Sequence, residues 1–155
     1  MAVPVHHVIE SVNEASRKPE KLVLLVGSPG SGKSKILREL AANRGWKYVD
    51  SRFLLSDEIL EMSPKSRAQQ APHLMSELLT SLNGEVILLD DAEVLFAPVL
   101  NLKPLELIRQ ISRKHTLVVG WPGQYTDGKL SLDYNGQRYD CPDAATENMT
   151  VISIG

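Results

Sequence analysis

Residues 27–34 carry a pattern that binds phosphate groups. They are Gly-Ser-Pro-Gly-Ser-Gly-Lys-Ser and match G-x-x-x-x-G-K-[ST] at every fixed position. Glycines let such a loop turn its amide N–H groups inward, toward an anion at the start of the next helix. We expect Lys33 to reach the β- and γ-phosphates and the Ser34 hydroxyl to ligate Mg²⁺. The pattern predicts a P-loop with Mg-ATP as the expected ligand, and its nucleotide-binding residues are Gly27, Ser28, Pro29, Gly30, Ser31, Gly32, Lys33, Ser34 and Lys35.

A second candidate group is a pair of carboxylates that follows an apolar run. Residues 86–89 are Val-Ile-Leu-Leu, and Asp90 and Asp91 come directly after them. A buried strand of this kind delivers its last residues to the carboxyl edge of the sheet, where ligands of α/β proteins bind. We expect Asp90 to hold Mg²⁺ through its water shell and Asp91 to polarise the attacking water, with Glu93 as a rival for that second role. Taken alone, the same pattern also fits a strand followed by a turn or a helix cap.

In many ATPases a polar residue that senses the γ-phosphate follows the strand that corresponds to residues 116–120. No such residue comes directly after these residues here. The chain continues as Trp121-Pro122-Gly123, and none of these side chains suits a phosphate or the lytic water. Gln124 or Thr126 would have to supply that role, and we interpret Trp121 as a packing residue. The sequence therefore predicts slow hydrolysis.

Three arginines are candidates for stabilising charge on the transferring phosphoryl group. Arg109 and Arg113 lie in a predicted helix, and Arg138 lies in a predicted hairpin. In related P-loop enzymes an arginine from a neighbouring molecule accelerates the reaction. We expect Arg109 or Arg113 to serve a neighbouring subunit, with Arg113 assigned as catalytic and Arg138 as the second choice. The alternative for each is an ordinary surface arginine.

Apolar periodicity predicts the strands and helices that place these groups. Strands are expected over residues 21–27, 47–50, 85–90, 116–120 and 150–154, and helices over 3–15, from the glycine loop to about 43–45, over 51–61 with Ser51 as N-cap, and over 66–82 and 104–113. Pro72 must start, restart or kink the helix over 66–82. Asn135-Gly136 predicts a type I′ turn between strands over 130–134 and 137–141. The 155 residues are thus predicted to form one α/β P-loop NTPase domain, with a mainly parallel five-stranded sheet flanked by helices and a β-hairpin before the last strand.

Composition excludes several classes of function. A net charge of −2 gives no basic footprint for nucleic acid, although contact with DNA stays open. The longest apolar runs are far shorter than the ~20 residues of a membrane-spanning helix, and a single cysteine, Cys141, excludes an internal disulfide. With no signal-peptide start, we expect a soluble, cytoplasmic protein that does not contact a membrane.

The segment Leu-Leu-Asp-Asp-Ala-Glu-Val-Leu-Phe at residues 88–96, together with Val-Val-Gly-Trp at 118–121, resembles BrxF, the small P-loop protein of type III BREX phage-defence systems. The resemblance continues through the hairpin that begins at residues 127–130 and the end strand at 151–154. It implies an ATP-binding, AAA-like core that works beside other BREX proteins: a BrxC-type ATPase, the phosphatase-like PglZ and a DNA methyltransferase. Pro122 departs from the polar residue, often Asn, that the family has after its tryptophan. The small C-terminal helical lid of full AAA+ proteins is also expected to be absent.

Three functions fit these residues. The first is an ATPase or ATP-dependent switch that hydrolyses slowly until it assembles as a homo-oligomer or with a partner. The second is a small-molecule kinase, although residues 128–137 offer only Lys129 where a kinase lid carries arginine. The third is a scaffold that binds ATP to hold its shape. The order of strands separates the first two, because a kinase of this size places the acidic strand next to the P-loop strand, whereas the ATPase class inserts residues 116–120 between them.

Overall fold

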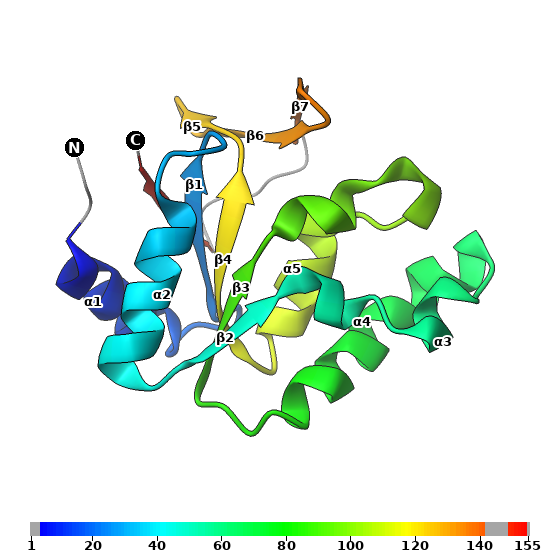
Figure 1. Ribbon diagram of the computed structural model, residues 1–155, viewed down its shortest axis with the longest axis horizontal. Helices are drawn as coiled ribbons and strands as arrows, with labels where there is room; N and C mark the ends of the chain where they lie inside the picture. The colour runs from blue at the N-terminus through cyan, green and yellow to red at the C-terminus, as the bar shows by residue number, and fades with distance from the viewer. Residues whose placement is uncertain (1–3, 142–148, 155) are drawn as a thin grey trace.

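A parallel sheet of five strands forms the centre of the protein, in the order β2-β3-β4-β1-β8 (Figure 1). The computed structural model describes residues 4–141 and 149–154. The strands are β1 (Leu22–Gly27), β2 (Lys47–Asp50), β3 (Val86–Asp90), β4 (Thr116–Pro122) and β8 (Thr150–Ser153). The predicted fold class is confirmed, and β4 lies between β1 and β3.

Helices cover both faces of this sheet. One face packs on α1 (Val5–Ala15) and α2 (Lys33–Arg44), the other on α4 (Pro64–Thr80) and α5 (Pro104–Ser112). In β1, Leu24 belongs to the core under α4 and α5, while Leu25 belongs to the core under α1 and α2. Burial on both faces is why this strand is an unbroken apolar run. The predicted start of the first helix at Val3 lies outside the described residues.

The helix expected over residues 51–61 is wrong as a continuous element. The chain forms a 3₁₀ turn, η1 (Ser51–Leu54), and then one turn of α-helix, α3 (Asp57–Leu60). The Asp50 carboxylate, not Ser51, caps η1 by accepting the Arg52 N–H at 2.9 Å, and Ser56 caps α3 by accepting the Ile59 N–H. Each cap satisfies a free N–H group at the start of a new turn. The helical structure therefore ends at Leu54 and begins again at Asp57.

Pro72 does not interrupt its helix. Helix α4 begins at Pro64, with Ser63 as N-cap, and continues through Pro72 to Thr80. Proline deprives the Ala68 carbonyl of its helical donor, but buried Ala71, Met75 and Leu79 pack α4 onto the sheet. Tertiary packing therefore keeps the helix continuous.

The predicted hairpin is present and belongs to a second, small sheet. It consists of β6 (Lys129–Tyr134) and β7 (Gln137–Asp140), joined by Asn135 and Gly136 at φ 53° and 78°, as a type I′ turn requires. A short strand that we did not predict, β5 (Tyr125–Thr126), pairs with β6. Strand β4 is two residues longer than expected, because Trp121 and Pro122 pair with Val26 and Gly27. Within the described ranges, none of the helices is long and apolar enough to cross a membrane.

Arg67 of α4 links two segments that lie apart in the sequence, α3 with the turn after it and residues 99–100. Its side chain is buried, and its guanidinium N–H groups donate to five backbone carbonyl oxygens. These carbonyls belong to Ile59, Leu60, Met62, Val99 and Leu100, at 2.9 to 3.2 Å. The last two lie in η3 (Pro98–Leu100), which follows η2 (Ala92–Phe96) after β3. One side chain thus fixes α3 against the chain that leaves the acidic strand.

We expect Arg67→Met to lower the free energy of unfolding by about 3 kcal/mol, because buried carbonyl groups lose their donors. Urea denaturation measures the change. Arg17→Met is the matched control: Arg17 is exposed, and its replacement should stay within about 0.5 kcal/mol of the parent. Equal urea midpoints for the parent and Arg67→Met would show that this network adds no stability.

Candidate nucleotide-binding site

The glycine loop connects β1 to α2 with the backbone shape that its glycines require. Gly30 and Gly32 have φ of 81° and 104°, and Gly32 is the N-cap of α2. At Gly27 a Cβ would clash with Ser31 Oγ and come within 2.9 Å of the Ile154 carbonyl oxygen. The loop therefore packs closely on the end of β8 at one glycine and turns with positive φ at the other two. Lys35 lies in the first turn of α2 with its side chain exposed.

Lys33 folds back over this loop. Its ammonium donates to the carbonyl oxygens of Gly27 at 2.7 Å and Ser28 at 2.9 Å. Burial lowers the pKa of Lys33, and the negative charges of Asp133, Asp90 and Glu93 oppose that change. Among the described residues, the buried Ser31 hydroxyl has no hydrogen-bond partner. A half-buried ammonium and an unpaired hydroxyl on one loop suit a phosphate group.

Asp90 joins the two predicted motifs. Its side chain is buried, and Oδ1 accepts the Ser34 hydroxyl at 3.0 Å and the Asp91 N–H at 2.9 Å, while Oδ2 accepts the Tyr48 hydroxyl. The pKa of Tyr48 is raised to about 12, mainly by burial and next by the hydrogen bond to Asp90. Ser34 and Asp90 thus offer the neighbouring oxygen donors that Mg²⁺ prefers, so the residues present fit this ion.

Two residues of this site were missed by the sequence analysis. Tyr48 comes from β2, and no motif marks it, because its approach to Asp90 depends on β2 lying beside β3. Gly120 lies in β4, where a Cβ would be 3.6 Å from Lys33 Cβ and 3.7 Å from Asp90 Oδ1. The strand that passes between the two motifs therefore presents a glycine to them.

The structure separates the two candidates for activating water. Asp91 has φ 56°, and its carboxyl group interacts with Asp50, the last residue of β2. The pKa of Asp91 is raised to about 6, mainly by a hydrogen bond with Asp50 and next by partial burial. Arg52 Nη2 lies 3.6 Å from Asp91 Oδ2. Glu93, by contrast, is one of the charges that act on Lys33, and its Oε1 accepts the Asn135 N–H at 3.0 Å. The water-activating role of Asp91 stays a prediction.

Trp121, near the end of β4, has the packing role that the sequence analysis gave it. Trp121 is buried, donates its indole N–H to the Ser131 carbonyl at 2.8 Å and packs against Phe96, which confirms it as a packing residue. Gln124 and Thr126 border a cavity of about 220 Å³ together with Gly27, Ser28 and Ser31 of the loop. Polar side chains after β4 therefore lie beside the P-loop, and their sensor role stays a prediction.

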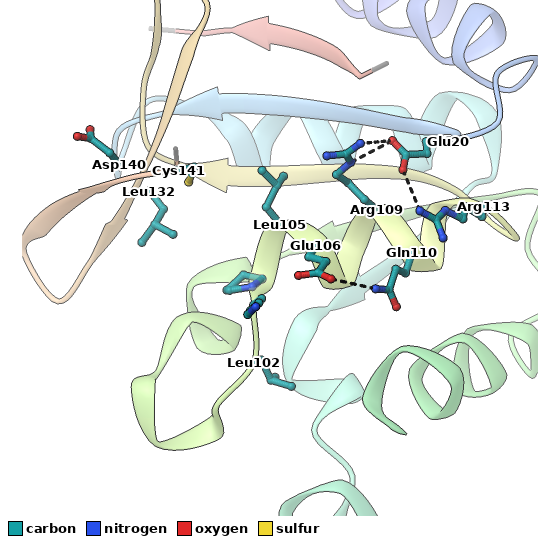
Figure 2. Close-up of a pocket in the computed structure, with 12 residues that line it drawn as sticks. Glu20, Leu102, Leu105, Glu106, Arg109, Gln110, Arg113, Leu132, Asp140 and Cys141 are labelled. Carbon is teal, nitrogen blue, oxygen red and sulfur yellow. Dashed lines mark hydrogen bonds and ion pairs between the residues drawn. The ribbon is translucent and has the colours of Figure 1, made fainter. Parts of the chain in front are cut away.

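Arg109 and Arg113 lie away from the P-loop of their own chain. Both pair with Glu20, Arg109 at 3.0 Å and Arg113 at 3.6 Å (Figure 2). Glu20 precedes β1, at the opposite edge of the sheet from Gly27. These residues line a cavity of about 630 Å³ between α5 and the hairpin, which no residue of the glycine loop borders. A role toward their own nucleotide is excluded by this position, whereas a role toward a neighbouring subunit stays a prediction.

Comparisons with known proteins give little beyond this geometry. No protein-family model matches the chain, and no curated protein matches it. One solved structure that does match is described as the crystal structure of a DNA replication initiation factor. The two are 14% identical with a TM-score of 0.48, and the match covers 96% of this chain and 45% of that one. A likeness this distant says nothing about the activity of the present chain.

Proposed function

We propose that this protein binds Mg-ATP at its P-loop and acts as an ATP-dependent switch with slow hydrolysis of its own. The contact between Ser34 and Asp90 supports this most directly, because it joins the two motifs across 56 positions of sequence. A glycine-rich turn that matched the P-loop pattern by chance would not be expected to contact the end of β3. Bound Mg²⁺ would neutralise phosphate charge, and Ser34 and Asp90 are the residues to hold it.

The strand order favours a switch or ATPase over a kinase. Strand β4 lies between β1 and β3, as we expect of the ATPase class, whereas a kinase of this size would place the acidic strand directly beside β1. The second candidate function is a scaffold that binds ATP without hydrolysing it. That alternative is favoured by β4 itself, since Gly120 and Pro122 give the site no polar side chain.

The biological setting belongs to the same proposal. The resemblance of residues 88–96 and 118–121 to BrxF supports a place in a BREX antiphage system, in the cytoplasm. The partners would then be a BrxC-type ATPase, PglZ or the methyltransferase, or further copies of this chain. Co-purification from cells that carry a type III BREX locus would test this, and recovery of the protein without any BREX component would count against it.

We expect Lys33→Ala to weaken Mg-ATP binding roughly ten- to a hundred-fold. The reason is that a hydrogen bond from a charged group contributes about 1.5 to 3 kcal/mol. Isothermal titration calorimetry is the measurement. Lys65→Ala, at an exposed lysine of α4, is the matched control and should bind like the parent. If Lys33→Ala also bound like the parent, the glycine loop would not be the nucleotide site.

A further inference from the structure

The β6–β7 hairpin lies at the carboxyl edge of the main sheet, on the same side as the P-loop (Figure 1). Strand β6 is held at two points. Near its start, Ser131 accepts the Trp121 indole N–H at its carbonyl and the Gln124 N–H at its hydroxyl. Just past its end, the Asn135 N–H donates to Glu93. The hairpin therefore bridges the end of β4 and the turn that follows the acidic strand.

An ion pair lies between these two anchor points. Arg138 of β7 is directly opposite Asp133 of β6, and its Nε and Nη2 donate to the two carboxylate oxygens at 2.7 and 3.0 Å. The Asp133 side chain is only 13% exposed, against 43% for Arg138. Asp133 is also one of the negative charges that oppose the lowering of the Lys33 pKa by burial. The largely buried carboxylate thus acts on the lysine of the P-loop and holds the arginine at the same time.

We propose that Arg138 binds the γ-phosphate of ATP in its own chain, and that Asp133 holds this arginine close to Lys33 until the triphosphate arrives. The inference rests on the proposed function, because it takes Lys33 to be a phosphate ligand. A γ-phosphate beside Lys33 repels Asp133 and offers the guanidinium more negative charge than one carboxylate does. ADP has no γ-phosphate and leaves the ion pair in place. Arg138 would therefore distinguish ATP from ADP.

This assignment changes the role expected of Arg138 from the sequence. There it was a candidate to serve a neighbouring subunit, whereas the hairpin that carries it is anchored at the carboxyl edge of the sheet, on the P-loop side of its own chain. The negative charges of Asp133, Asp90 and Glu93 all act on Lys33, and Arg138 pairs with the first of them. The competing explanation is a cross-strand pair that only stabilises the hairpin and does not contact the nucleotide.

The two explanations predict different changes in nucleotide affinity when Arg138 and Asp133 are replaced. We expect Arg138→Ala to weaken Mg-ATP binding roughly tenfold or more and to leave Mg-ADP binding unchanged. Asp133→Asn should tighten Mg-ATP binding several-fold, because a like charge is removed from beside the γ-phosphate. A pair that only holds the hairpin would make both variants weaker, for ATP and ADP alike.

Calorimetry with Mg-ATP and with Mg-ADP is the test, on the parent, Arg138→Ala, Asp133→Asn and the control Lys129→Ala, an exposed residue of β6. Arg138→Lys serves as a second variant should Arg138→Ala not fold; it keeps the charge, loses the fork of two donors, and should show a smaller loss for ATP alone. Equal effects on ATP and ADP, or weaker ATP binding by Asp133→Asn, would overturn the inference. If the parent binds Mg-ATP, Lys33→Ala does not, and Arg138→Ala binds like the parent, only this inference fails. A parent that binds neither nucleotide overturns the proposed function as well.

Discussion

Assembly, with further copies of the chain or with a partner protein, should raise ATP turnover by roughly 10³- to 10⁵-fold, the gain that a supplied arginine gives related P-loop enzymes. With Arg138 as the one arginine proposed to contact the γ-phosphate of its own chain, the isolated chain still leaves much of the charge on the transferring phosphoryl group uncompensated. Strand β4 presents Gly120 and Pro122 where a polar sensor is expected, and three carboxylates act on Lys33. Arg113 is 65% exposed at the opposite edge of the sheet, where a neighbouring subunit could approach it.

Turnover measured against protein concentration, alone and with partner proteins, tests this expectation. Sedimentation at the same concentrations gives the oligomeric state. Arg109→Ala and Arg113→Ala should lower the activated rate, whereas Arg17→Ala, at an exposed arginine after α1, should not. Arg109→Ala and Arg113→Ala also lose an ion pair with Glu20, so their thermal stability must be compared with that of the parent. Rapid turnover by a monomer would rule out the need for a neighbour.

Asp91→Asn should slow a single turnover of bound ATP by roughly 10²- to 10⁴-fold, the usual contribution of a general base, and leave Mg-ATP binding unchanged. Asp91 follows the buried Asp90 directly, and its side chain is 47% exposed, so it is open to water. Asp90→Ala should instead weaken Mg²⁺-dependent binding, because Asp90 accepts the Ser34 hydroxyl at the ion site. The two carboxylates would then have separate functions.

Glu93→Gln is the matched comparison for Asp91→Asn. The amide oxygen of glutamine can still accept the Asn135 N–H that Glu93 binds, so the hairpin tip keeps its anchor. A loss of rate in Glu93→Gln with no loss in Asp91→Asn would assign the base to Glu93, which lies on the Lys33 side of the site. Equal losses of binding and rate in Asp90→Ala and Asp91→Asn would contradict separate roles for these neighbours.

The features that the sequence determined are local in the chain. The glycine loop needs eight consecutive residues, and its shape follows from glycines that tolerate positive φ at positions 30 and 32. The turn at Asn135-Gly136 is fixed in the same way. The buried strands β1 and β3 could be recognised because burial on both faces requires an unbroken apolar run. Lys33, Ser34 and Asp90 could therefore be identified as candidate site residues from the sequence alone.

Other features of the site depended on how distant segments pack. Tyr48 reaches Asp90 only because β2 lies beside β3, and Gly120 comes close to both Lys33 and Asp90 only because β4 lies between β1 and β3. Strand order depends on contacts among residues far apart in the chain, and a local pattern does not encode these. The same holds for Asp133 and Arg138, which look like an ordinary hairpin pair in the sequence. Their position relative to Lys33 was decided by where the hairpin is anchored, at Trp121 and Glu93.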